Sequence, residues 1–93
     1  MDKLYIVFAL LPKEPYIVYY CGNNEEANKP MFHDAAGLVK QMSLEEAEEV
    51  FKHVGVKDKS ITFCLMEWTK FMNVYQFTGT SKEDFVKASI KIK

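Results

Sequence analysis

The sequence predicts one α+β domain, a small antiparallel sheet of four or five strands with one long and one short helix packed on one face. Two apolar, β-rich runs near the start are separated by prolines, which is typical of a hairpin. A strongly amphipathic segment follows at 43–55, with helix signals at both ends. The chain has 93 residues and is 48% apolar, which suits a single globular domain spanning 1–93.

The first hairpin is predicted from residues 3–11 and 16–21. Residues 3–11 are apolar at both odd and even positions, as in a strand covered on both faces. Pro12 and Pro15 break this run, because proline lacks an amide donor and restricts φ. After the second strand, we expect a polar loop over 22–30 and an irregular stretch that ends in a short strand near 38–42.

The long helix is predicted over 44–54. Ser43 and Glu46 fit a capping box, in which each residue satisfies a free amide of the other. Glutamates crowd the first turns and cations occupy the last, as the helix dipole favours. The apolar residues recur at helical spacing and form one stripe: Leu44, Ala47, Val50, Phe51 and Val54.

Residues 61–77 fit two structures. Strands over 61–67 and 73–78 suit the β-branched and aromatic content. One continuous helix suits the spacing of the apolar residues Ile61, Leu65, Trp68, Met72 and Tyr75. We favour the strands, because a two-stranded hairpin needs further sheet partners. A second capping match at 80–83 predicts a short helix to about residue 88, and the tail is expected to fray or to add an edge strand.

Charge and composition narrow the classes of partner. The formal charge is −1 and all twelve basic residues are lysine, so the planar fork that arginine offers to phosphates and guanine is missing. Nucleic acid is therefore disfavoured as a partner. The apolar run at 4–11 is too short to span a bilayer, which takes about 20 residues, and it lacks a small-residue cleavage site. We expect a cytoplasmic protein that does not bind membranes.

No catalytic or metal-binding motif is recognisable. A nucleophile could be assembled from Cys21 or Cys64, His33 or His53, and Asp34, but nothing local places these residues together. The cysteines lie too far apart in sequence for the paired ligands of a structural zinc site, and lone thiols of this kind are usually reduced and buried. We expect no enzyme activity, no metal and no cofactor.

Two groups of residues are candidates for an interface. The preferred group combines aromatic and methionine side chains, which are enriched at interface centres: Trp68, Phe71, Met72 and Tyr75. The alternative is that these residues belong to the core. The second is an acidic helix face that either mimics a nucleic acid or is simply solvated: Glu45, Glu46, Glu48 and Glu49.

A hairpin that leads into the segment Ser43-Leu44-Glu45-Glu46-Ala47-Glu48-Glu49 resembles small accessory proteins of phages and mobile elements in AT-rich bacteria. This resemblance implies binding to a host or defence component and transfers no functional residue. The leading hypothesis is a non-enzymatic protein–protein interaction module, with an inhibitor or anti-defence role as its most specific form and homodimerisation as a variant. The alternative is a small-ligand or nucleic-acid binding domain that uses lysines around exposed aromatic residues.

Overall fold

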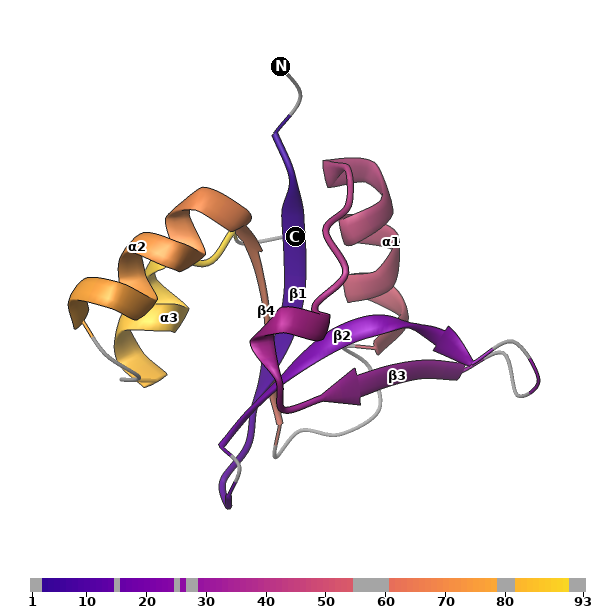
Figure 1. Ribbon diagram of the computed structural model, residues 1–93, viewed down its shortest axis with the longest axis horizontal. Helices are drawn as coiled ribbons and strands as arrows, with labels where there is room; N and C mark the ends of the chain where they lie inside the picture. Colours follow the sequence, from indigo (N-terminus) through magenta and orange to yellow (C-terminus); the bar gives the residue numbers. More distant parts are fainter. Residues whose placement is uncertain are drawn as a thin grey trace.

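The fold is an antiparallel sheet with helices on both sides (Figure 1). The computed structural model describes residues 3–14, 16–24, 26, 29–54, 61–78 and 82–90, with side chains at all of these except 36, 74–78 and 82–84. The elements in chain order are β1 (Tyr5–Leu10), β2 (Ile17–Asn24), β3 (Lys29–His33), a 3₁₀ turn η1 (Ala36–Leu38), α1 (Leu44–Val54), β4 (Thr62–Glu67), α2 (Trp68–Thr78) and α3 (Lys82–Ala88). The predicted α+β class is confirmed.

Strand β1 lies inside the sheet, whose order is β3-β2-β1-β4 with every pair antiparallel. Its side chains alternate between two buried clusters. Ile6 and Phe8 point into the cluster on one face, and Val7 points into the cluster on the other. A strand that is apolar at both parities therefore does have cover on both faces, as its sequence predicts.

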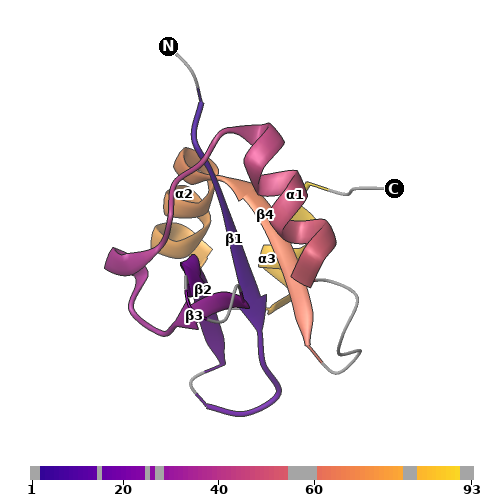
Figure 2. The ribbon, with the colours of Figure 1, turned by 90° about the vertical axis from the view of Figure 1, so that its right-hand side faces the viewer.

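The expectation of two helices packed on a single face is wrong. The described residues form three α-helices, and Figure 2 shows α1 and α2 on opposite sides of β1. Phe71 of α2 and Phe85 of α3 belong to one buried cluster, whereas Ala47 and Val54 of α1 belong to the other. Cover on both faces follows physically from β1, since helices on one side alone would leave half of its apolar side chains in water.

Strands β1 and β2 form the predicted hairpin, but residues 22–24 and 29–30 of the expected polar loop are strand, and residues 25, 27 and 28 lie outside the described part. β2 continues to Asn24, and β3 begins at Lys29 and pairs with it. The register shifts between Tyr20 and Gly22, which marks a bulge, and Gly22 has a φ of 126° that suits only glycine. Pairing with β2, rather than its own composition, makes β3 a strand.

The short strand expected at 38–42 is reduced to a single bridge. The 3₁₀ turn η1 occupies its beginning, and Met42 then exchanges backbone hydrogen bonds with Tyr5. The amide of Lys40 donates to the carbonyl of Tyr20 at 2.8 Å. Because β2 pairs only with the last three residues of β1, this segment covers the edge that β2 leaves open.

Helix α1 has the bounds that its sequence predicts. The amide of Glu46 donates to Ser43 Oγ at 3.3 Å, which is one half of the expected capping box. Four members of the predicted stripe pack as expected, because Ala47 and Val54 are buried and Val50 and Phe51 pack against the same cluster. The fifth, Leu44, is 37% exposed.

The ambiguous stretch divides into one strand and one helix. The strand expected at 61–67 is confirmed as β4, whereas the strand expected at 73–78 is wrong, because α2 runs through it. The short second helix is confirmed as α3. Beyond it, the amide of Ile90 donates to the carbonyl of Leu65 in β4 at 2.7 Å, and residues 91–93 lie outside the described part.

Among the residues that the structure describes, none of the helices is both long enough and apolar enough to cross a bilayer.

Candidate functional site

The four aromatic and methionine residues expected at an interface have different environments. Phe71 is 1% exposed and belongs to the core, so it cannot contact a partner in this conformation. Trp68 is half-buried and stacks on Phe71, with ring centroids 5.8 Å apart and planes inclined by 17°. Met72 is 38% exposed. Tyr75 lies in α2, but its side chain is outside the described set.

Met72 is part of an apolar surface that we call the α2 patch, made of Leu4, Trp68 and Met72. The amide of Trp68 donates to the carbonyl of Leu4 at 2.8 Å, which places the start of α2 beside the start of β1. Leu4 shares the parity of Ile6 and is 44% exposed. Met72 lies one helical turn after Trp68, on the same side of α2. The three side chains therefore lie on the same side of the sheet, near the start of α2.

Most of the aromatic rings that the structure describes are buried or half-buried, so the high aromatic content gives less support to an interface than the sequence suggests. Phe71 contacts Phe8, Tyr19 and Phe85 at centroid distances of 5.4 to 5.7 Å, and all four are buried. Among the described phenylalanine, tyrosine and tryptophan side chains, Tyr16 is mostly exposed, at 57%, and the others are buried or half-buried. A binding mode that relies on several exposed rings therefore has little support in the described residues.

Tyr16 has a backbone conformation that its sequence does not reveal. Its φ is 67°, a region that bulky residues avoid, although Pro15 before it signals a turn. Two backbone hydrogen bonds hold it there: its amide donates to Lys13 and its carbonyl accepts from Leu11. The exposed ring offers no burial to offset the cost of this conformation.

The acidic residues of α1 form the solvated face that their spacing predicts. Glu45, Glu46 and Glu49 are exposed and Glu48 is half-buried. They line a shallow groove together with Lys52. No described contact joins them to a cation of the same chain closer than 4 Å, so the face is an open negative surface.

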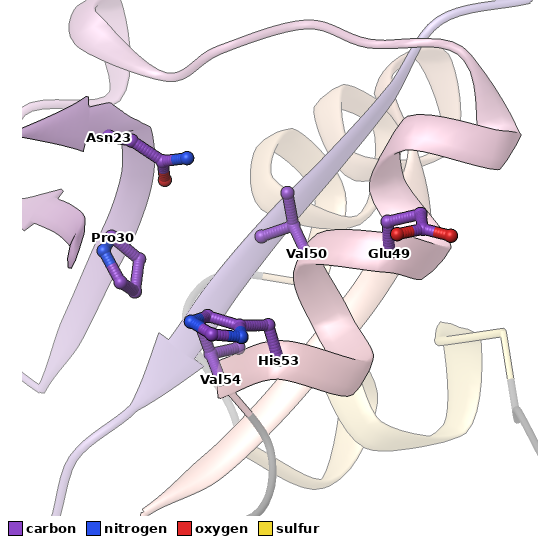
Figure 3. A pocket seen from close by; sticks show the side chains of 6 residues that line it. All are labelled: Asn23, Pro30, Glu49, Val50, His53 and Val54. Atoms are coloured by element: carbon purple, nitrogen blue, oxygen red, sulfur yellow. The ribbon is translucent and has the colours of Figure 1, made fainter. Parts of the chain in front are cut away.

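A pocket lies between this helix and the far end of the β2–β3 hairpin, and sequence reasoning missed it. Its volume is about 220 Å³. The hairpin contributes Asn23 and Pro30, and α1 contributes a run of side chains from its second half: Glu49, Val50, His53 and Val54. In Figure 3 the ring of His53 extends from α1 towards Pro30, and the amide of Asn23 reaches from β2 towards α1.

A buried hydroxyl fixes the amide of Asn23. The Tyr20 hydroxyl donates to Asn23 Oδ1 at 2.7 Å. Burial, and then the nearby Cys21 and Glu46, raise the pKa of Tyr20 above its ordinary value of 10.0, so the hydroxyl keeps its proton and remains a donor. The oxygen of Asn23 must then face Tyr20, and its nitrogen lies on the side of α1 (Figure 3).

Two of the residues that could assemble a thiol nucleophile lie together, because His33 Nδ1 is 3.1 Å from Asp34 Oδ1. Cys64 is buried in the core, and Cys21 Sγ donates weakly to the carbonyl of Met31. His33 Nδ1 accepts from the amide of Ala35 at 3.0 Å. Across the described ranges, no group of three or more histidine, cysteine or acidic side chains is placed to hold a metal.

Comparison of this chain with known protein families, with curated proteins and with solved structures found no match.

Proposed function

We propose that this protein is a non-enzymatic protein–protein interaction module that binds its partner through the α2 patch. The observation that carries the proposal is the exposure of Leu4 and Met72 on either side of a half-buried tryptophan. Flexible methionine beside a fixed aromatic ring is typical of interface centres.

The patch is organised before a partner arrives. Trp68 stacks on Phe71, which is itself locked among buried rings. Its orientation therefore needs no ordering on binding, which lowers the entropic cost of association. A rigid tryptophan with apolar neighbours has the composition of an energetic hot spot.

The size of the patch favours a different protein as partner over a second copy. A stable dimer buries about 800 Å² per partner, and three partly covered side chains supply only a fraction of that area. A small apolar patch of this kind suits a transient contact.

A photo-crosslinking experiment tests this proposal. A benzophenone amino acid replaces Met72 in one sample and Leu38 in the control, because Leu38 is also exposed but lies in η1, outside the patch. In an extract of the source cells, we expect one discrete adduct from position 72 only. Unlabelled wild-type protein should suppress it, whereas unlabelled Met72→Glu should compete about tenfold less well, because the carboxylate must be desolvated.

Equal adducts from both positions would contradict the proposal. So would a Met72→Glu protein that competes as well as wild type. Far-UV circular dichroism confirms that the variant is folded, which its exposed position leads us to expect.

A further inference from the structure

We infer that the pocket between α1 and the β2–β3 hairpin binds the guanidinium group of an arginine on a partner protein. This site is separate from the α2 patch, because its residues come from β2, β3 and α1. The inference rests on the shape of the pocket, the charge around it and the fixed amide of Asn23.

The pocket has the size of one side chain. Its volume of about 220 Å³ lies below the ~300–1,000 Å³ of pockets that hold drug-sized ligands. Val50, Val54 and Pro30 give it apolar walls, against which the methylene stem of an arginine can lie. The flat ring of His53 offers a surface on which a planar guanidinium can stack.

The charge around the pocket is negative from two sources. Glu49 belongs to the lining, and α1 carries three further glutamates and the single lysine Lys52. The last turn of α1, which ends at Val54 in the pocket wall, is also the negative end of the helix dipole. On the facing hairpin, the described charges are Glu26 and Lys29, which offset each other. A cation is therefore the favoured occupant.

The side-chain amide of Asn23 requires that the occupant of the pocket also carry a hydrogen-bond acceptor. Since Tyr20 occupies its oxygen, Asn23 can offer only N–H donors to the pocket. An arginine residue within a chain meets both needs: its guanidinium can bind Glu49 at the edge of the lining, where Figure 3 shows the carboxylate on the side away from Asn23, and a backbone carbonyl at the mouth can accept from Asn23. A carboxylate and a guanidinium also form paired, charge-assisted hydrogen bonds, which an ammonium group cannot match.

The chain itself cannot supply this occupant, because all of its basic residues are lysine. A second copy is therefore excluded as the source of a guanidinium. The arginine must come from a different protein.

Nuclear magnetic resonance titration tests this assignment with three blocked tripeptides, acetyl-Gly-Arg-Gly-amide and its lysine and citrulline counterparts. Citrulline keeps the shape of arginine and removes the charge. We expect the arginine peptide to shift the side-chain amide signal of Asn23 and the ring signals of His53. The lysine peptide should bind several-fold more weakly, and the citrulline peptide should give no saturable shift.

Two charge-matched variants separate the pocket from general attraction to the acidic helix. Glu49→Gln should weaken the arginine peptide about tenfold, as expected for loss of a charge-assisted pair. Glu45→Gln removes the same charge from the same helix but lies outside the pocket lining, and it should change affinity less than about twofold, because exposed charges are screened by solvent.

Equal weakening by both variants, or equal binding of all three peptides, would overturn the inference. Met72→Glu should leave binding of the arginine peptide unchanged, so that failure of this site and failure of the α2 patch give different results.

Discussion

Replacing Phe71 with alanine tests whether α2 is anchored to the sheet as described. The ring is 1% exposed and lies within 5.8 Å of the rings of Phe8, Tyr19, Trp68 and Phe85, measured between centroids. A buried phenylalanine replaced by alanine costs about 3–5 kcal/mol. Contacts between ring pairs add to the free energy gained from burying apolar area, although the four contacts share one ring and their contributions cannot simply be summed. We therefore expect a loss of stability in the upper half of that range.

This loss is large for a chain of 93 residues. At about 0.05–0.15 kcal/mol per residue, its free energy of unfolding is roughly 5–14 kcal/mol. A loss of about 4 kcal/mol should lower the melting temperature by more than about 15 °C, since each kcal/mol shifts a domain of this size by about 4–8 °C.

The assay is urea unfolding, followed by far-UV circular dichroism and by the fluorescence of Trp68, the one tryptophan in the chain. Met72→Ala is the matched control, because it truncates the next residue of the same helix at an exposed position, and it should cost less than about 1 kcal/mol. If Phe71→Ala costs no more than Met72→Ala, then α2 does not pack on the sheet through Phe71 and the reasoning is refuted.

Two further predictions concern single tyrosines. A non-glycine residue in the left-handed region costs about 1–2 kcal/mol, and the greater backbone entropy of unfolded glycine offsets part of that cost. Tyr16→Gly should therefore raise the free energy of unfolding by roughly 0.5–1 kcal/mol in urea titrations, whereas Tyr16→Ala should not. A glycine variant less stable than the alanine variant would contradict the backbone conformation of Tyr16. For Tyr20, the raised pKa means that the folded state holds its proton above pH 10, where the unfolded state loses it. Its contribution to stability is therefore complete below pH 10 and lost as the pH rises further. Tyr20→Phe should flatten this alkaline loss in pH-dependent melts, and an unchanged alkaline slope would argue against burial of the hydroxyl.

Local signals made some elements predictable. Helix α1 could be placed to the residue because its cap, its apolar stripe and its charge gradient all lie within 12 consecutive positions, 43–54. Interactions that close within one or two helical turns require no knowledge of the rest of the fold. The prediction for β1 was also local, and its two apolar faces already argued against a sheet with helices on one side only.

Elements that depend on distant partners were not predictable in the same way. Residues 61–77 fit both strands and a helix, and the strands that we favoured are wrong from Trp68 onward, where α2 begins. The pairing of β4 with β1 ends at Glu67 opposite Tyr5, and Met42 occupies the other edge of β1 there. The chain beyond Trp68 therefore has no strand beside it to bond, and a helix satisfies its backbone internally. The same reasoning explains β3, whose polar sequence becomes a strand through its pairing with β2.

The candidate sites were also predictable only where the signal is local in sequence. The spacing of Trp68, Phe71 and Met72 indicated an apolar segment, but only the position of α2 against Phe8 and Tyr19 decided that Phe71 is core and Met72 is surface. The pocket joins a hairpin to a later helix, and its nearest lining residues from the two elements, Pro30 and Glu49, are 19 positions apart, so no local pattern indicates it.

The sequence by itself determined the α+β class, the first hairpin, helix α1 and its acidic face, because these depend on contacts between near neighbours and on the need to bury an apolar strand. Tertiary structure alone decided which face each helix covers, which rings are hidden, and that Asn23 and Glu49 border one pocket. These outcomes depend on packing between residues far apart in the chain, where the burial of one side chain is set by partners that its own neighbours do not specify.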